Sequence, residues 1–162
     1  MGSAIVIMGV SGSGKTSVAK LLSDSLHCCF LDADDFHSES NKEKMGKGIP
    51  LSDEDRLPWL ESLRDAIRQK TSNGELVALA CSALQKRYRD ILRSADPDYK
   101  SGDYTRCIVK FFCLVAPVEV IAERMNGRSE KEEHFMPVSL LRSQLELLQV
   151  DDSEGIPQID SV

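Results

Sequence analysis

The sequence predicts an α/β protein built on a parallel sheet, and three observations support this prediction. Apolar runs of strand length alternate with amphipathic stretches of helix length along the 162 residues, which is typical of parallel strands covered by helices. A glycine-rich segment at residues 9–14 separates the first apolar run from the first helical stretch. The length corresponds to about one domain, and a chain of this size can bury a core without disulfides or a structural metal.

The expected elements follow one another in a regular order. Strands are expected at residues 4–8, 28–31, 76–81 and 107–115, with an edge strand at 156–162. Helices are expected at residues 15–25, 38–47, 52–73 and 84–95, after Pro117, and at 138–148. The third helix has a start signal in Ser52 and the acids after it, and a stop signal in Asn73-Gly74. Its buried face is expected to carry Leu57, Leu60, Leu63 and Ile67.

Composition and charge exclude several classes of protein. The chain is 41% hydrophobic and 28% charged, which is ordinary for a globular protein and excludes a disordered or fibrous one. The net charge of -6 argues against nucleic acid as a partner, and no apolar run approaches the ~20 residues that cross a bilayer. The first apolar run leaves no room for a signal segment, so a cytoplasmic protein is expected. The five cysteines lack C-x-x-C and zinc spacing and are expected to be reduced thiols.

One motif predicts a nucleoside-triphosphate site. The pattern G-x-x-x-x-G-K-[ST] is matched by Gly9, Val10, Ser11, Gly12, Ser13, Gly14, Lys15 and Thr16. Glycines let the backbone turn tightly, so that successive N–H groups and the positive end of the next helix point at phosphate oxygens. Lys15 is expected to reach the β- and γ-phosphates, and the Thr16 hydroxyl to ligate Mg²⁺.

Two acids after the second strand predict what the triphosphate is used for. The chain has no [NT]-K-x-D stretch of a GTPase, and the strand at 76–81 ends in Cys81-Ser82-Ala83 rather than in the acids of an ATPase motor. Asp32 and Asp34 instead follow the second strand, and strand ends at one edge of a parallel sheet meet in the same crevice. Asp32 and Asp34 are expected to point the same way, because side chains alternate along an extended segment. We expect Asp32 near Mg²⁺ and Asp34 facing an acceptor hydroxyl; the alternative is a solvated acidic turn.

Longer motifs resemble the gluconokinase family. They are Asp32 to His37, the runs at residues 41–51, 53–60 and 81–90, His134-Phe135-Met136, and Ser143-Gln144. The resemblance covers roughly residues 4–150. Shikimate kinases share the D-x-D pattern but have glycines in place of Ser82-Ala83.

The resemblance implies both a fold and a reaction. The implied fold is a three-layer P-loop kinase fold: a five-stranded parallel sheet, helices on both faces and a mobile lid at residues 126–136. The implied reaction is phosphorylation of D-gluconate by ATP and Mg²⁺ at the 6-hydroxyl, which gives the 6-phosphogluconate that enters the pentose phosphate pathway. Bacterial members are homodimers. A single domain is expected over residues 1–162, ending before the family's closing helix.

Motif and resemblance together assign roles to individual residues. Catalytic roles are expected for Lys15, Asp34 and Arg128, a nucleotide contact for Arg124, and metal ligation for Thr16 and Asp32. Substrate contacts are expected for Asp34, His37, Arg56, Lys86 and Arg89. Arg56 is the first candidate for the substrate carboxylate, because a guanidinium fork pairs with a carboxylate through two hydrogen bonds. Arg89 is the next candidate.

Several alternatives stay open. Arg124 and Arg128 could be solvated arginines, His37 a helix cap, and Arg56 part of a salt bridge within its helix. Trp59 is expected in the core rather than under a sugar. A kinase for another small hydroxy acid, such as shikimate, and a nucleotide-binding module without transfer activity are the competing functions.

Overall fold

The protein has a five-stranded sheet with the strand order β2-β3-β1-β4-β5, and every pair of neighbours is parallel. The computed structural model describes residues 2–10, 13–115, 148 and 152–160. The strands are β1 (Ser3–Met8), β2 (Cys29–Asp32), β3 (Leu76–Ala80), β4 (Val109–Val115) and β5 (Gln158–Asp160). The prediction of a parallel sheet with a short edge strand near the C-terminus is confirmed.

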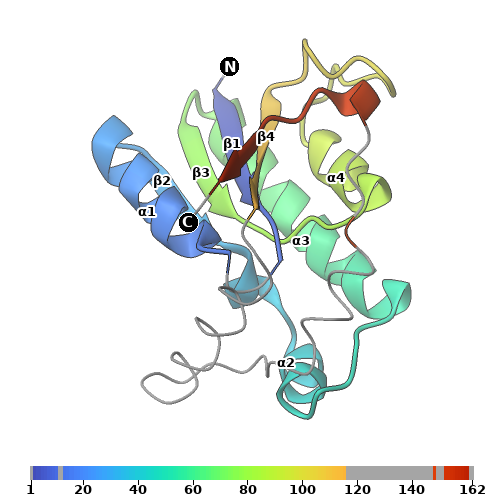
Figure 1. The fold of residues 1–162 in the computed structure, drawn as a ribbon. Coiled ribbons are helices and arrows are strands. Elements are labelled where there is room, and N and C mark those ends of the chain that lie inside the picture. The colour runs from blue at the N-terminus through green and yellow to red at the C-terminus, as the bar shows by residue number, and fades with distance from the viewer. Residues whose placement is uncertain (1, 11–12, 116–147, 149–151, 161–162) are drawn as a thin grey trace.

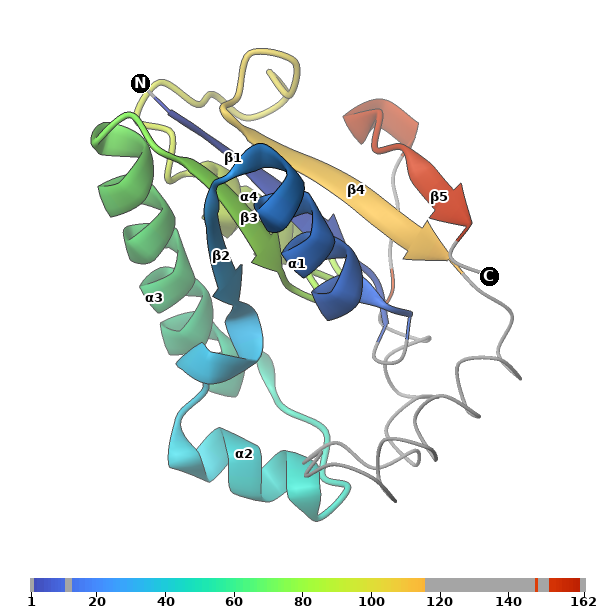
Figure 2. The same ribbon diagram turned by 90° about the vertical axis from the view of Figure 1, so that its left-hand side faces the viewer.

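Helices cover both faces of this sheet (Figure 1). They are α1 (Lys15–Leu26), α2 (Glu39–Gly46), α3 (Asp53–Ser72) and α4 (Lys86–Arg93), with short 3-10 helices η1 (Ala33–Phe36) and η3 (Asp152–Glu154). Figure 2 shows α1 in front of the strands and α4 behind them, while α2 lies beyond their carboxyl ends. The three-layer arrangement is therefore confirmed. The helices predicted after Pro117 and at 138–148 lie outside the described residues.

The central strands are buried on both faces, and alternate residues supply two separate cores. Val6, Met8, Leu79 and Phe111 pack with Leu63 and other residues of α3 and α4. Ile7, Ala80 and Leu114 pack on the opposite face with Ala19 of α1. Because side chains alternate along a strand, a strand with a helix on each side needs apolar residues at successive positions. β3 is apolar throughout, and β1 and β4 are apolar except for Ser3 and Lys110.

Helix α3 begins and ends at the signals that the sequence carries. Ser52 and Asp55 form a capping box, and the helix stops at Asn73, before Gly74 with a φ of 81°. The prediction that Leu57 belongs to its buried face is wrong, because this side chain is 46% exposed. The buried face is centred on Trp59, Leu60, Leu63 and Ile67. At 3.6 residues per turn Leu57 lies about 100° from that centre.

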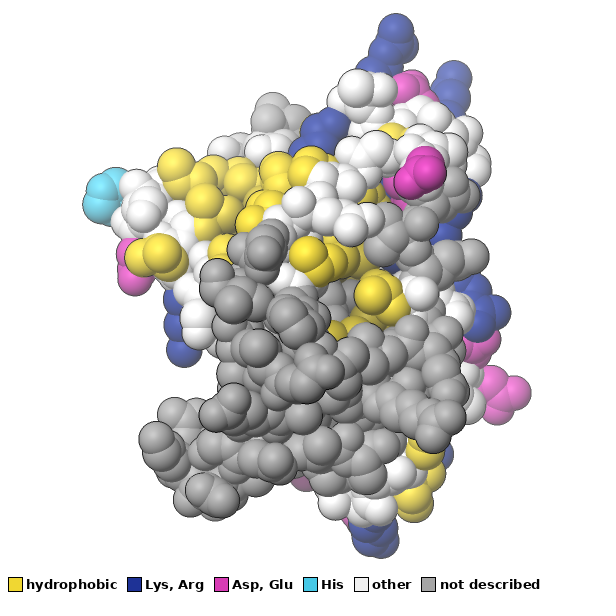
Figure 3. Space-filling view, in the orientation of Figure 1, with side chains coloured by type: hydrophobic (Ala, Val, Ile, Leu, Met, Phe, Trp, Pro, Cys, Tyr) yellow, Lys and Arg dark blue, Asp and Glu magenta, His cyan; other side chains and the backbone are white. Residues whose placement is uncertain are grey.

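The surface carries apolar side chains beside α1. On the face seen in Figure 3 they gather over α1 and the neighbouring strands. Leu21 and Leu26 of α1 and Ile159 of β5 are among the exposed large hydrophobic residues. Within the described part of the chain, no helix is long and apolar enough to cross a membrane. All five cysteines are free thiols; Cys81, Cys107 and Cys113 are buried, and Cys28 and Cys29 are half-buried.

Candidate active site

The first glycine of the motif closely approaches two neighbouring segments. Gly9 follows β1 with a φ of 145°, and its N–H donates to the Ser82 carbonyl at 3.3 Å. A Cβ at this position would lie 2.8 Å from Ser13 Oγ and 2.9 Å from the Leu114 carbonyl oxygen. Only glycine fits here without displacing either segment.

The end of the loop opens helix α1 as the motif predicts. Gly14 is the N-cap residue, with a left-handed φ of 98°, and Lys15 and Thr16 are the first residues of the helix. The Lys15 ammonium lies 3.4 Å from the Val10 carbonyl oxygen. The strand, turn and helix are therefore arranged so that the positive helix end and Lys15 meet the loop. Ser11 and Gly12 lie outside the described residues.

Asp32 and Asp34 come together at the end of β2, although not for the predicted reason. The segment after Asp32 is the 3-10 helix η1 rather than extended chain, so strand alternation does not apply. Asp32 caps η1: its Oδ1 accepts the backbone N–H of Asp34 at 3.0 Å. Burial raises the pKa of Asp32, and the charge of Asp34 raises it further, while the Asp34 N–H and the Lys15 ammonium lower it. The acid pair lies at the carboxyl end of β2, at the same edge of the sheet as the start of α1.

Trp59 of α3 holds the segment that carries these acids. Its Nε1 donates to the Ala33 carbonyl at 2.7 Å, and its ring stacks on His37 with centroids 4.1 Å apart and 15° between the planes. The prediction that Trp59 belongs to the core is confirmed, and its burial lets α3 fix the conformation of η1.

His37 is buried and neutral. Burial is the main cause that lowers its pKa from 6.5 to about 4. The positive charges of Arg56 and Lys42 lower this pKa further, whereas the negative charge of Asp34 raises it. The Asn41 side-chain amide contacts His37 Nδ1 at 3.3 Å and donates to the Asp55 carbonyl at 2.9 Å. This hydrogen bond assigns the proton of the neutral ring to Nε2, which makes Nε2–H a donor. His37 is also the C-cap residue of η1, which confirms the alternative prediction that it caps a helix.

Arg56 belongs to a polar cluster between α3 and α4. Its NH1 donates to Tyr88 Oη at 3.2 Å, and Tyr88 Oη donates to Asp53 Oδ1 at 2.7 Å. Arg87 NH2 pairs with Asp53 Oδ2 at 2.8 Å. Among the described residues Arg56 forms no ion pair. The alternative that Arg56 forms a salt bridge within its helix is therefore wrong.

Two predicted substrate residues are held elsewhere. The Arg89 side chain is 0% exposed; it forms two hydrogen bonds with the Glu154 carboxylate, at 2.9 and 2.6 Å, and one with the Ala83 carbonyl at 2.9 Å. Lys86 lies 3.6 Å from Asp90 and over the Tyr104 ring at 5.7 Å. Since the buried ion pair occupies Arg89 and α4 directs Lys86 along its own surface, neither is included in the proposed site.

The sequence motifs missed Tyr88, Asp53 and Glu154. Tyr88 lies inside the run at 81–90 and Asp53 among the acids of a helix start, so neither stands out as a site residue. Glu154 belongs to no motif that the sequence analysis identifies. Arg124, Arg128 and the lid at 126–136 lie outside the described residues, and their roles stay predictions.

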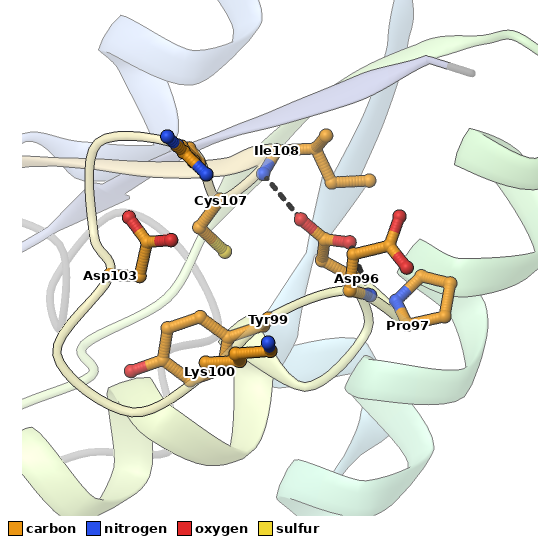
Figure 4. A pocket seen from close by; sticks show the side chains of 9 residues that line it. Asp96, Pro97, Tyr99, Lys100, Asp103, Cys107 and Ile108 are labelled. Atoms are coloured by element: carbon orange, nitrogen blue, oxygen red, sulfur yellow. Dashed lines mark hydrogen bonds between the residues drawn. The ribbon is translucent and has the colours of Figure 1, made fainter.

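A separate cavity lies at the opposite end of the sheet. It has a volume of about 660 Å³ and is lined by the loop at residues 96–108, directly before β4 (Figure 4). Asp96 closes it by accepting the backbone N–H of Ile108 at 3.0 Å. It lies at the amino ends of the strands, whereas the phosphate loop follows the carboxyl end of β1.

In this parallel sheet a strand leads through a glycine turn into a helix that begins with Lys15 and Thr16, and an acid pair lies at the end of β2. This arrangement defines a P-loop nucleoside-triphosphate-binding protein. The family described as "AAA domain" matches residues 5–150. A protein of Arabidopsis thaliana described as "Gluconokinase" is 56% identical over 161 residues, which cover 99% of this chain and 85% of that protein. The chain belongs to the gluconokinase family.

Solved structures agree with this placement. The crystal structure of a gluconokinase from Sinorhizobium meliloti 1021 is 38% identical with a TM-score of 0.80, over 99% of this chain and 83% of that one. An unliganded sugar kinase from Janibacter sp. HTCC2649 is 42% identical with a TM-score of 0.84, over 99% of this chain and 86% of that one.

Proposed function

We propose that the protein phosphorylates D-gluconate at the 6-hydroxyl, using ATP and releasing ADP and 6-phospho-D-gluconate. The observation that carries the reaction type is the arrangement at the carboxyl edge of the sheet: the helix that begins with Lys15 follows β1, and the Asp32–Asp34 pair lies at the end of β2 of the same parallel sheet. Family membership over almost the whole chain supports gluconate as the acceptor. Phosphoryl transfer needs positioning and charge stabilisation more than covalent chemistry, and this site supplies both.

On the phosphate side, backbone N–H groups of residues 9–14 surround the β- and γ-phosphates, and Lys15 neutralises charge on the transferred group. Thr16 and Asp32 would hold Mg²⁺. Their hydroxyl and carboxylate oxygens are the ligands that this ion takes together with phosphate oxygens and water. Burial and the charge of Asp34 raise the pKa of Asp32, and a cation bound beside it would lower that pKa and favour the ionised carboxylate. Bound Mg²⁺ would neutralise charge that develops on the phosphates.

On the acceptor side, Asp34 orients the 6-hydroxyl and accepts its proton. His37 donates Nε2–H to another hydroxyl of the sugar acid. The Arg56 guanidinium pairs with the substrate carboxylate, and its contact with Tyr88 fixes the orientation of the fork. A neutral sugar lacks this carboxylate, so Arg56 supplies selectivity for an acid.

The remaining parts of the proposal rest on resemblance. Arg124 contacts the nucleotide, Arg128 contacts the transferred charge, and the segment at 126–136 closes over ATP. A homodimer in the cytoplasm remains the expectation for the assembly and its location.

The proposal is tested by coupled measurement of ADP formation against a panel of acids. D-gluconate should give turnover, 6-deoxygluconate should not, and the product should carry phosphate at carbon 6. Turnover with shikimate alone would favour the competing hydroxy-acid kinase, and ATP binding without turnover would favour the binding module. Asp34→Asn should abolish most activity, whereas the exposed Asp98→Asn should leave it unchanged.

A further inference from the structure

Ala83 has a backbone conformation that its side chain does not favour. Its φ is 44°, in the left-handed region, and the residue is 1% exposed in the loop between β3 and α4. Among the described residues, the other non-glycine residue with positive φ is His27, which ends helix α1, where this conformation is common. Ala83 does not end a helix, since it lies between β3 and α4. Strained backbone of this kind persists only where surrounding contacts impose it.

A buried ion pair contacts the Ala83 backbone. Arg89 NH1 donates to the Ala83 carbonyl at 2.9 Å, while Nε and NH2 of the same guanidinium bind both oxygens of Glu154. Arg93 NH1 adds a second cation to Glu154 at 2.7 Å. Because the Glu154 carboxylate holds two nitrogens of the rigid guanidinium, the third is aimed at Ala83.

The loop that contains Ala83 touches the phosphate loop. The Ser82 carbonyl accepts the Gly9 N–H at 3.3 Å, and Cys81 N–H donates to the Ile7 carbonyl at 3.1 Å. The same loop leads directly into α4, which carries Tyr88 of the acceptor-side cluster. Ala83 therefore lies in the loop that connects the phosphate side of the site to the acceptor side.

We propose that Glu154 is a positioning residue: through Arg89 it holds Ala83 in the left-handed conformation and so fixes the phosphate loop relative to the acceptor side. This inference rests on the proposed kinase function. Loss of the ion pair lets Ala83 relax, which moves the Ser82 carbonyl and misaligns the acceptor with the γ-phosphate.

The test compares kcat, KM and folding in matched variants. Glu154→Gln and Arg89→Lys should each lower kcat about tenfold to a hundredfold, the effect expected of a misplacement near 1 Å, with the KM for ATP within about threefold of the native value. Adding Ala83→Gly to either variant should restore much of kcat, since glycine adopts positive φ without a contact to impose it. A residue that only supported folding would not be rescued in this way.

Asp96→Asn is the control. Like Glu154→Gln, it removes a buried carboxylate, but one that accepts the backbone N–H groups of Asp98 and Ile108 at the opposite end of the sheet. It should lower Tm and leave kcat unchanged. Hydrogen exchange gives a readout besides activity: the Gly9 N–H should exchange faster in Glu154→Gln and Arg89→Lys than in Asp96→Asn.

Three results would overturn the inference: unchanged kcat in folded Glu154 and Arg89 variants, a loss of kcat that Ala83→Gly does not restore, or failure of all these variants to fold. A native protein that phosphorylates no acid would instead contradict the proposed function. The Gly9 exchange measurement would then still decide whether Glu154 controls the loop.

Discussion

The two halves of the site are built in different ways. On the phosphate side, the backbone itself is the binding group, and its shape depends on glycines within six consecutive residues, with φ values of 145° at Gly9 and 98° at Gly14. On the acceptor side, side chains from distant segments meet: Tyr88 bonds to Asp53, 35 positions away, and to Arg56, 32 positions away. The first half is a local property of the sequence, and the second depends on how α3 packs against α4.

This difference explains where a substitution should act. Changes in the phosphate loop should affect binding and transfer of any phosphate donor. Changes in the cluster of α3 and α4 should affect the acceptor alone. The predictions below test that separation, from the largest expected effect to the smallest.

Lys15→Ala should have the largest effect. It removes the ammonium that neutralises charge on the transferred phosphoryl group, so kcat should fall by about a thousandfold or more. The measurement is steady-state ADP formation with saturating gluconate. Lys20→Ala, an exposed lysine of the same helix, is the matched control and should keep native turnover. Near-native kcat in Lys15→Ala would contradict the nucleotide site.

Arg56→Lys should affect the acceptor alone. A lysine keeps the charge but cannot form the two-pronged pair with a carboxylate, so the KM for gluconate should rise about tenfold to a hundredfold, equivalent to roughly 1–3 kcal/mol. The KM for ATP should stay unchanged. Arg87→Lys is the control, since Arg87 also lies over the Tyr88 ring but pairs with Asp53. A lower Tm with an unchanged KM for gluconate would assign Arg56 a structural role.

His37 should make the protein less stable in weak acid. The unfolded chain takes up this proton near pH 6.5, whereas the folded protein takes it up only near its lowered pKa of about 4. The unfolded state therefore binds more protons between these values, and stability falls as the pH drops from 6.5 toward 4, by roughly 3 kcal/mol at most.

Thermal unfolding at a series of pH values tests this. His37→Phe keeps a ring on Trp59 but cannot titrate, so its Tm should depend less on pH in that window. His27→Asn replaces an exposed histidine and should follow the native pH dependence. Identical pH profiles for the native protein and His37→Phe would contradict the argument.

The contrast between local and distant contacts also sets how much could be read from the sequence. The strand, glycine turn and helix around Gly9, the start of α3 at Ser52 and the acids at the end of β2 were predictable, because each depends on neighbouring residues or on repeating apolar patterns. The place of Arg89 was not, because its partner Glu154 lies 65 positions further along the chain. A charged residue near a motif can face a substrate or a buried partner equally well until packing is known.

The orientation of Asp34 shows the same limit on a smaller scale. Alternation along a strand predicted where it points, but Asp32 caps a 3-10 helix instead, since its carboxylate accepts the Asp34 N–H. The acids still meet, because capping also brings residues two apart together.

Tyr88→Phe should have the smallest effect and is the sharpest test of the acceptor cluster. It deletes one hydroxyl, which accepts from Arg56 and donates to Asp53, and leaves the ring packed in the core. Arg56 then loses a contact worth about 1 kcal/mol that orients its fork, so the KM for gluconate should rise roughly threefold to tenfold while the KM for ATP stays constant. Tyr99→Phe is a matched control, because it deletes the same kind of tyrosine–aspartate bond, to Asp90 at 2.9 Å, on the other side of α4. It should change Tm but neither KM. If Tyr88→Phe raised the two KM values equally, the separation between the phosphate side and the acceptor side would be wrong, since a hydroxyl bonded to Arg56 and Asp53 would then be controlling the phosphate loop.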